Sequence, residues 1–179
     1  MDFRMTPTMN LDQIHAMIRD VPDFPKPGIL FKDITPVLSN PQAFNSLAAH
    51  LAKLVPPQTT RLASIESRGF ILGAAVAMHL GIGLVLIRKP GKLPFSTFSH
   101  SYDLEYGKDT LQIHVDALGP KDHVCIIDDV LATGGTANAA EVLCLETGAV
   151  ITGFAFMMEI GFLKGRSKLK ANAKSLMTL

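Results

Sequence analysis

Two adjacent carboxylates, Asp128 and Asp129, end an apolar run and precede a run of small residues. The apolar run, Val124 to Ile127, is rich in β-branched residues, which is typical of a strand buried on both faces of a parallel sheet. Neighbouring strand residues point to opposite faces, so both carboxylates cannot enter a core, and the pair indicates that the strand runs out into a polar crevice. Ligands of open α/β sheets bind at this carboxyl end, where carboxylates suit hydroxyl donors or a divalent cation.

The residues that follow could hold an anion. Glycines let backbone N–H groups crowd around a phosphate, hydroxyls add donors, and a helix is predicted from Thr136 to Thr147 with Gly148 as its stop. A solvated turn would explain the tetrapeptide from Thr133 alone, but the strand and carboxylates before it favour a site for a phosphorylated ribose. The residues of this predicted phosphate loop are Ala132, Thr133, Gly134, Gly135 and Thr136.

Two further segments bring anion-binding groups to the ends of predicted strands. Glu66-Ser67-Arg68-Gly69 follows one strand and opens a helix, so backbone donors and a guanidinium could bind a second anion there. A surface ion pair is the simpler alternative for Arg68 by itself. Arg88, Lys89 and Lys92 follow another strand and could reach the same anion.

These segments resemble the type I phosphoribosyltransferases, and the resemblance covers most of the chain. It also rests on residues 24–35, 88–94 and 102–108, which together narrow it to the members that act on adenine. It implies a purine salvage enzyme that transfers the phosphoribosyl group of 5-phosphoribosyl 1-pyrophosphate to adenine, giving AMP and pyrophosphate.

The resemblance implies roles for the sugar and phosphate residues. Asp128 and Asp129 would bind the ribose hydroxyls, and the phosphate loop would bind the 5′-phosphate. The negative charge of the two aspartates would also favour a cationic transition state. A cis peptide bond is expected between Glu66 and Ser67. The residues expected to hold pyrophosphate are Glu66, Ser67, Arg68, Arg88, Lys89 and Lys92.

The catalytic residues implied by the resemblance are Glu105 and Arg68. Glu105 would exchange a proton with the purine, and enclosure beside Tyr106 would raise its proton affinity. Composition alone would favour a solvated loop glutamate. His100 matches no catalytic position.

Base recognition is expected from a short apolar stretch near the start of the chain. Phe31 would stack on the purine, the backbone of Leu30 and Lys32 would read its edge, and Ile160 would close the other side. Lys32 stands where eukaryotic members commonly have arginine, so a side-chain contact to the base stays open. Without the resemblance, core packing would be the preferred interpretation of Phe31.

The elements that must position these residues alternate along the chain, which predicts an α/β fold with a mainly parallel twisted sheet flanked by helices. Helices are expected over residues 11–21, 41–55, 70–80 and 136–147, and strands over 61–65, 84–87, 111–115, 124–128 and 150–159. Residues 90–107 are expected to form a long, flexible functional loop. One domain is expected over 1–179, with residues 1–35 as an N-terminal arm and small hood beside the base.

Composition limits the class of protein. The 179 residues are 47% apolar and carry a net charge of +1, so no polyanionic partner is implied, and neither nucleic acid nor a membrane is expected as a partner. A basic cluster, Lys164 to Lys174, is interpreted as a solvated helical face.

No signal-peptide or membrane-spanning run is recognised, so a cytoplasmic protein is expected. Cys125 and Cys144 are expected to be buried free thiols.

The resemblance also implies Mg²⁺, bound mainly through substrate and water rather than by direct protein ligands, and a homodimer.

Three alternative functions remain. A regulatory protein of the same fold would sense phosphoribosyl pyrophosphate without chemistry, and it would keep the aspartates but lose the loop. The presence of Glu105, Arg68 and Phe31 favours the enzyme. A related transferase would use a 6-oxopurine. A P-loop hydrolase is weaker still, since its lysine-containing motif is missing.

Overall fold

Five strands form a parallel sheet at the centre of the protein. The computed structural model describes residues 7–104 and 107–179. The strand order is β4-β3-β7-β8-β9, so the strand that carries the paired aspartates lies in the middle, and every neighbouring pair in this sheet is parallel. The strands are β3 (Arg61–Ile65), β4 (Gly83–Ile87), β7 (His123–Leu131), β8 (Val150–Glu159) and β9 (Ala173–Thr178).

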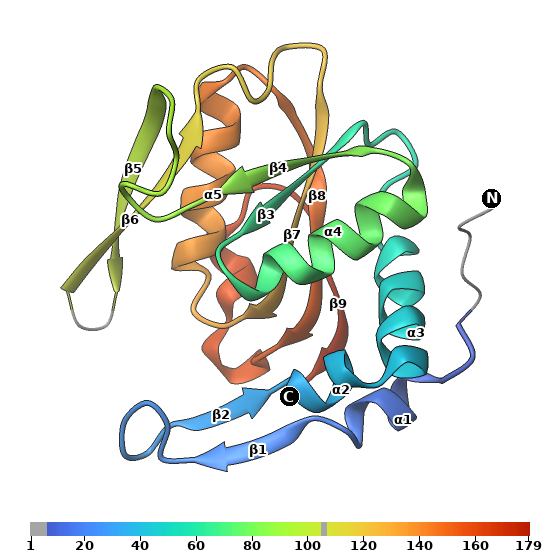
Figure 1. Cartoon of the computed structure of the whole chain (residues 1–179). Helices are drawn as coiled ribbons and strands as arrows, with labels where there is room; N and C mark the ends of the chain where they lie inside the picture. Colours follow the sequence, from blue (N-terminus) through green and yellow to red (C-terminus); the bar gives the residue numbers. More distant parts are fainter. Residues whose placement is uncertain (1–6, 105–106) are drawn as a thin grey trace.

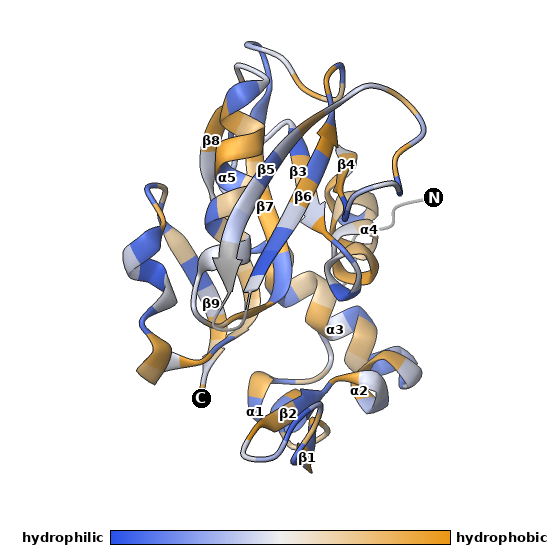
Figure 2. Ribbon diagram, turned by 90° about the vertical axis from the view of Figure 1, so that its left-hand side faces the viewer, coloured by the Kyte–Doolittle hydropathy of each residue, from blue (hydrophilic) through white to orange (hydrophobic). Residues whose placement is uncertain are grey.

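Helices cover both faces of this sheet (Figure 1). On one face α3 (Pro41–Ala52) and α4 (Arg68–Leu80) enclose an apolar cluster that includes Cys125 and Ile127 of β7. On the other face α5 (Gly135–Glu146) covers a second cluster that includes Val124 and Ile126. Alternate residues of β7 therefore enter opposite cores, which explains why Val124 to Ile127 are all hydrophobic, and β7 is coloured as hydrophobic over this part of the strand (Figure 2).

The predicted α/β class with a parallel sheet between helices is confirmed. The strand predicted over residues 61–65 coincides with β3, and the helices predicted over 41–55, 70–80 and 136–147 correspond to α3, α4 and α5. Helix α3 begins where predicted because the Asn40 side chain accepts the Ala43 N–H and Pro41 occupies the first turn. Within residues 7–104 and 107–179, no helix is long and apolar enough to cross a membrane.

The N-terminal region forms a small hood made of α1 (Leu11–His15), β1 (Arg19–Pro22), β2 (Leu30–Asp33) and α2 (Thr35–Ser39). The single helix predicted over residues 11–21 is wrong, because the chain leaves the helix at His15 and enters a strand. Strand β1 pairs antiparallel with β2, and this pairing overrides the helical spacing of the apolar residues. Lys32 Nζ donates to Asp20 Oδ1 at 2.6 Å across the two strands.

The loop predicted over residues 90–107 is wrong in its second half. Thr97–Leu104 is a strand, β5, that pairs antiparallel with β6 (Gly107–His114). Polar side chains bond across the pair, as between Ser101 and Thr110 at 2.8 Å, so hydroxyl-rich sequence forms a strand here. Phe98 and Tyr102 pack against the core beneath α5, but their spacing of four residues fits one face of a helix as well as of a strand, so it could not by itself have predicted β5.

The C-terminal basic cluster is not a helical face, and that prediction is wrong. The chain makes two short 3₁₀ turns, Gly161–Leu163 and Gly165–Lys168, and then joins the sheet as β9. Lys164 between the turns adopts a left-handed conformation with φ of 53°. Arg166 is bonded to Glu159 and Ser175, so this cation is not simply solvated.

Both cysteines are buried free thiols, as predicted. Cys125 lies in β7 and Cys144 in α5, on opposite faces of the sheet. Burial raises the pKa of each thiol to about 12, so both remain protonated at neutral pH.

Candidate active site

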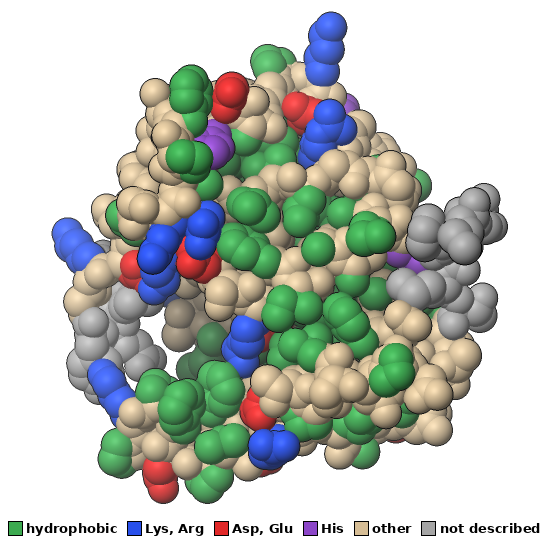
Figure 3. Space-filling view, in the orientation of Figure 1, with side chains coloured by type: hydrophobic (Ala, Val, Ile, Leu, Met, Phe, Trp, Pro, Cys, Tyr) green, Lys and Arg blue, Asp and Glu red, His purple; other side chains and the backbone are tan. Residues whose placement is uncertain are grey.

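The predicted chemical groups meet at one edge of the sheet, where β3, β4 and β7 end. The parallel register brings Ile65 opposite Ile87 and Ser64 opposite Ile127, so the segments that follow these strands emerge side by side. In the space-filling view this edge is hollowed between the hood and the β5–β6 hairpin, with Lys and Arg side chains around the rim (Figure 3). This is the edge at which open parallel sheets bind ligands.

The phosphate loop lies between β7 and α5 and encloses a small cavity of about 100 Å³. Asp128 and residues 130–137 line it, and α5 begins at Gly135, so free N–H groups of the first helical turn are aimed at the loop. Gly134 has a φ of 80°, a conformation that side chains disfavour. Thr136 Oγ1 donates to Tyr102 Oη at 3.1 Å, which joins the loop to the hairpin. The geometry is that of an anion cradle.

The two aspartates differ in burial. Asp129 is only 5% exposed, whereas Asp128 is partly exposed at the cavity. The prediction that the strand runs out at this point is wrong, since β7 continues to Leu131. Asp128 accepts the Asp129 N–H at 2.9 Å. Burial raises the pKa of both carboxyls, and the Asp129 charge raises that of Asp128 further.

Arg68 compensates the buried aspartate. Its Nε lies 2.7 Å from Asp129 Oδ2, and the contact is an ion pair without hydrogen-bond geometry, because Oδ2 has no hydrogen-bond partner among the described residues. The guanidinium also lies over the Phe31 ring, 4.7 Å from its centroid, and Nη1 donates to the Lys32 carbonyl at 3.2 Å. Arg68 therefore connects the central strand to the hood. The Asp129 side chain is only 7% exposed, so this contact is not the surface ion pair that was the simpler alternative for Arg68.

Glu66 organises the cationic loop after β4. Its carboxylate accepts two bonds from Arg88, each 3.2 Å, and the Lys89 N–H at 3.0 Å. Burial raises the pKa of Glu66, but these bonds outweigh it and the net pKa is lowered. The peptide bond between Glu66 and Ser67 is cis, as the resemblance implied. The structure thus brings the two predicted pyrophosphate segments together.

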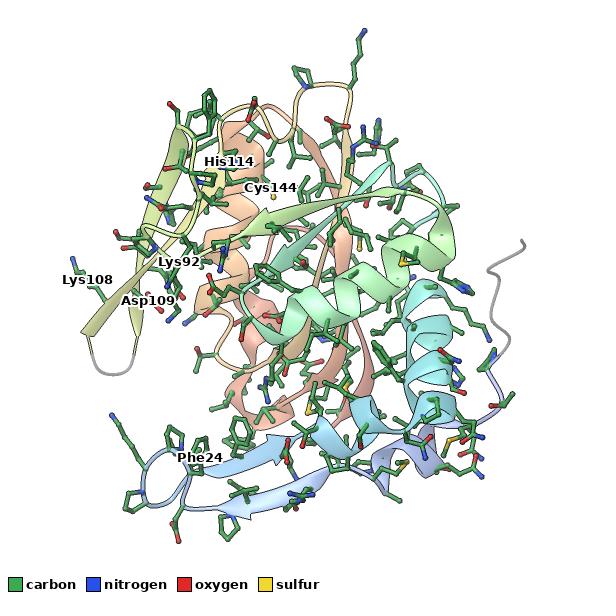
Figure 4. All side chains as sticks on the ribbon, viewed as in Figure 1. Phe24, Lys92, Lys108, Asp109, His114 and Cys144 are labelled. Carbon is green, nitrogen blue, oxygen red and sulfur yellow. The ribbon has the colours of Figure 1, made fainter. Side chains whose placement is uncertain are left out.

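The β5–β6 hairpin supplies groups that the sequence did not single out. Lys89 Nζ donates to Asp109 Oδ2 at 2.9 Å, and Tyr102 Oη donates to the same oxygen at 3.5 Å. Lys92 is exposed, and its carbonyl accepts from Arg88 Nη1 at 3.0 Å. Figure 4 shows Lys92 and Asp109 on neighbouring segments at this edge of the molecule. Asp109 lies just before the strand predicted over residues 111–115, and its contact with the cationic loop arises only when β5 and β6 pair in the folded chain.

A larger cavity of about 770 Å³ separates the hood from the sheet edge. All four residues predicted for the base line it: Leu30, Phe31, Lys32 and Ile160. Phe24 stands edge-on to Phe31 at 5.1 Å between ring centroids, and Figure 4 shows it at the hood. The sequence missed several other lining residues, for which only apolar type was a signal: Ile29, Phe162, Leu163 and Leu179.

Glu105 and Tyr106 lie outside the described residues. The flanking strands β5 and β6 reach the site through Tyr102, which contacts Thr136 of the phosphate loop, and Asp109, which contacts Lys89 of the cationic loop. His100, which had no predicted role, lies on β5.

A phosphate loop and paired aspartates on the central strand, cationic loops beside them and an apolar pocket beneath an N-terminal hood are the parts of a type I phosphoribosyltransferase. No protein-family model matches the chain. Whole-chain comparisons with known proteins nevertheless give a more specific result.

The adenine phosphoribosyltransferase of Synechococcus sp. strain JA-3-3Ab is 55% identical over 158 residues, which covers 87% of this chain and 90% of that protein. The crystal structure of adenine phosphoribosyltransferase from Thermoanaerobacter pseudethanolicus superimposes with a TM-score of 0.93 at 47% identity, covering 95% of this chain and all of that one. The Saccharomyces cerevisiae enzyme, solved with adenine and an imino-altritol bisphosphate, has a TM-score of 0.88 at 39% identity and 93% and 97% coverage. The chain belongs to the adenine phosphoribosyltransferase family.

Proposed function

We propose that this protein is a purine salvage enzyme that transfers the phosphoribosyl group of 5-phosphoribosyl 1-pyrophosphate to adenine, giving AMP and pyrophosphate. One observation carries the proposal: the phosphate cavity and the apolar cavity share Val130, Ala132 and Thr133 in their walls. A ligand that holds a phosphate in one cavity and a flat base in the other would therefore pass the end of β7, where Val130 directly follows the two aspartates. A nucleoside monophosphate has that composition.

The sugar half of the substrate is assigned to β7 and the loop after it. Asp128 and Asp129 bind the ribose hydroxyls, and residues Ala132 to Thr136 bind the 5′-phosphate through N–H groups and hydroxyls. Ribose binding to Asp129 would weaken the ion pair between Asp129 and Arg68, because the ribose hydroxyls and the guanidinium would compete for the same carboxylate. Carboxylates beside the ribose also stabilise the positive charge that develops as the bond to pyrophosphate breaks.

The pyrophosphate is assigned to the cationic side of the crevice. Arg68, Arg88 and Lys89 supply charge, Glu66 and Ser67 supply the turn that presents them, and Lys92 adds a further cation from the exposed loop. Arg68 is assigned a catalytic role because its guanidinium can stabilise the negative charge that develops on the departing pyrophosphate. It can do so while it contacts Asp129 and the Phe31 ring.

Proton transfer at the purine is assigned to Glu105, with Tyr106 as its neighbour. Attack by one ring nitrogen of adenine on the ribose carbon leaves the ring positively charged, and removal of a proton from the purine restores its neutrality. A carboxylate in an enclosed site has a proton affinity suited to that transfer.

The base is assigned to the apolar cavity. Phe31 stacks on one face of adenine, Ile160 closes the other, and the backbone of Leu30 and Lys32 reads the edge. The Lys32 side chain is assigned to the hood rather than to the base, since Nζ is bonded to Asp20. This division supports recognition by backbone groups, which can distinguish the amino group of adenine from the carbonyl of a 6-oxopurine.

Mg²⁺ is proposed as the cofactor, held mainly by substrate oxygens and water. The donor set supports this, since Asp128 is a partly exposed carboxylate at the phosphate cavity, whereas Glu66 is bonded to Arg88 and Asp129 is paired with Arg68. Magnesium would neutralise the pyrophosphate as it leaves, and Asp128 would contact it only through the bound ribose or water, because it is assigned to the ribose hydroxyls. No group of three or more ligand residues suited to a metal occurs within residues 7–104 and 107–179.

We further propose one domain over residues 1–179 with residues 1–35 contributing to the base site, a cytoplasmic location and a homodimer. The exposed apolar side chains of Ile71 and Met78 on α4 and Leu86 on β4 support a self-associating face. Neither nucleic acid nor a membrane is proposed as a partner.

The test is an assay of the purified protein with Mg²⁺, 5-phosphoribosyl 1-pyrophosphate and each of adenine, guanine and hypoxanthine. We expect AMP and pyrophosphate from adenine, and much slower reaction of the two 6-oxopurines. Preference for a 6-oxopurine would assign the related transferase activity. Binding of 5-phosphoribosyl 1-pyrophosphate without turnover of any base would favour the regulatory alternative.

A further inference from the structure

The phosphate loop is in direct backbone contact with a distant part of the chain. A Cβ placed on Gly134 would overlap the Gly165 carbonyl oxygen, and a Cβ on Gly165 would overlap the Ala132 carbonyl oxygen and lie 3.0 Å from the Gly134 nitrogen. Both neighbours are backbone atoms, which cannot rotate away as a side chain would. Only glycine fits at Gly165 while the phosphate loop keeps its shape.

The residues that follow Gly165 continue along the helix that starts in the phosphate loop. Asn138 Nδ2 donates to the Lys168 carbonyl at 3.0 Å. The Glu141 carboxylate, only 1% exposed, accepts the Lys170 N–H at 3.0 Å and the Ala171 N–H at 2.8 Å. The segment Gly165–Ala171, named here the C-terminal clamp, therefore follows α5 for its first two turns.

The C-terminal clamp is also fixed to the sheet. Arg166 Nε donates to Glu159 Oε2 at 2.6 Å, Nη2 donates to Ser175 Oγ at 3.2 Å, and Nη1 donates to the Ala173 carbonyl. The bond from Arg166 lowers the pKa of Glu159, so this carboxylate stays ionised and the ion pair persists at neutral pH. These bonds tie the clamp to β8 and β9, so it can act as a rigid support for the loop.

We propose that Gly165 is a positioning residue for the phosphate of the substrate. The C-terminal clamp holds the backbone of Ala132 to Gly134 in the shape that binds a phosphate monoester, and Gly165 allows the close approach that this requires. The inference rests on the proposed function, because it concerns the same phosphate site. It also gives a role to the basic C-terminal stretch, whose Arg166 anchors the support and whose Lys168 and Lys170 backbones bind α5.

Gly165→Ala tests the proposal, with Gly119→Ala as the matched control. A Cβ at Gly119 would have no heavy atom within 4 Å, so the control makes the same change in open space. Ribose 5-phosphate binding is measured by calorimetry, and KM is measured for 5-phosphoribosyl 1-pyrophosphate and for adenine. We expect about tenfold weaker binding of ribose 5-phosphate and a similar rise in KM for 5-phosphoribosyl 1-pyrophosphate, as a misplaced phosphate loop loses part of its bonding. KM for adenine should rise by a clearly smaller factor, since Ala132 and Thr133 line both cavities but Phe31, Leu30 and Ile160 lie outside the phosphate loop.

Asn138→Ala is the second variant, because it removes one bond between α5 and the clamp from a partly exposed side chain. It should weaken ribose 5-phosphate binding by about two- to fivefold even if Gly165→Ala fails to fold. Wild-type affinity in both variants, or equal losses for ribose 5-phosphate and adenine, would overturn the proposal. If the wild-type protein itself neither binds ribose 5-phosphate nor turns over adenine, the proposed function fails instead.

Discussion

Lys89 Nζ lies 2.9 Å from Asp109 Oδ2, and this ion pair joins the cationic loop after β4 to the β5–β6 hairpin. The Lys89 bond lowers the pKa of Asp109, although burial alone would raise it, and the same bond raises the pKa of Lys89. Tyr102 contacts the same carboxylate and also Thr136 of the phosphate loop. A continuous chain of polar contacts therefore links two segments that we assign to the two phosphate ends of the substrate.

Asp109→Asn should strengthen pyrophosphate binding. The carboxylate neutralises Lys89 in the ligand-free protein, so its removal leaves more positive charge for an anionic ligand. The Lys89 side chain is 54% exposed and solvent screens the pair, so we expect only about a two- to fivefold change, largest at low salt. Calorimetric titration with pyrophosphate at two salt concentrations measures it. Asp116→Asn, an exposed position in the turn after β6, is the control. Equal effects of both changes would show that only net charge matters.

Glu105→Gln should reduce turnover far more than ribose-phosphate binding. A glutamine keeps the size of the side chain but cannot accept the purine proton, and proton transfer by a positioned side chain contributes about 10²- to 10⁴-fold to a rate. Initial rates with adenine and calorimetry with ribose 5-phosphate separate the two effects. Glu146→Gln at the exposed end of α5 should change neither. Turnover unchanged in Glu105→Gln would remove this residue from the mechanism.

Arg68→Met should destabilise the protein at neutral pH. It leaves the buried Asp129 carboxylate without its cation, and since the guanidinium is 32% exposed we expect a loss of about 2–3 kcal/mol in the free energy of unfolding, below the cost of a fully buried pair. Arg61→Met is the control, because its contact with Asp122 is exposed and 3.8 Å long. Its loss should be below about 1 kcal/mol.

The pH dependence of the Arg68→Met effect has a definite sign. Burial already raises the pKa of Asp129 above its ordinary value of 3.8, and loss of Arg68 raises it further. At low pH this carboxyl is protonated in both the folded and the unfolded protein, and its raised pKa does not affect the free energy of unfolding. Above the pKa of the unfolded state, the carboxyl ionises more readily in the unfolded protein, and the folded protein loses stability. The melting temperatures of variant and wild type should therefore differ most near neutral pH and converge near pH 4. A constant difference across this range would contradict the assignment to Asp129.

The sheet was predictable because its strands carry their own signals. Val124 to Ile127 is apolar at every position, and each core helix has a stop or cap such as Gly81 or Asn40. The hood and the hairpin were not predictable in this way. Arg19 to Pro22 becomes a strand only by pairing with Leu30 to Asp33, and neither segment has a buried face that would impose a regular pattern.

The residue types of the candidate site were predictable, but the pairing of its charges was not. Motifs identified Asp129, Arg68 and Glu66 as members of a ligand site. Their contacts depend on elements that meet only in the folded chain: Arg68 comes from α4 to Asp129 on β7, and Arg88 comes from the end of β4 to Glu66. The support from Gly165 was invisible for the same reason, since a glycine followed by basic residues is also typical of an exposed turn.

Phe31→Ala and Lys32→Ala should separate side-chain from backbone recognition of the base. Phe31 lines the apolar cavity and contacts both Phe24 and Arg68, so its truncation should raise KM for adenine about tenfold or more. Lys32 Nζ is bonded to Asp20 across the hood, and its carbonyl, which accepts from Arg68, is retained in the alanine variant. Lys32→Ala should therefore raise KM for adenine by less than about threefold. Lys53→Ala, an exposed lysine just after α3, controls for loss of charge. A larger effect of Lys32→Ala than of Phe31→Ala would show that the lysine side chain, rather than the aromatic ring, dominates binding of the base.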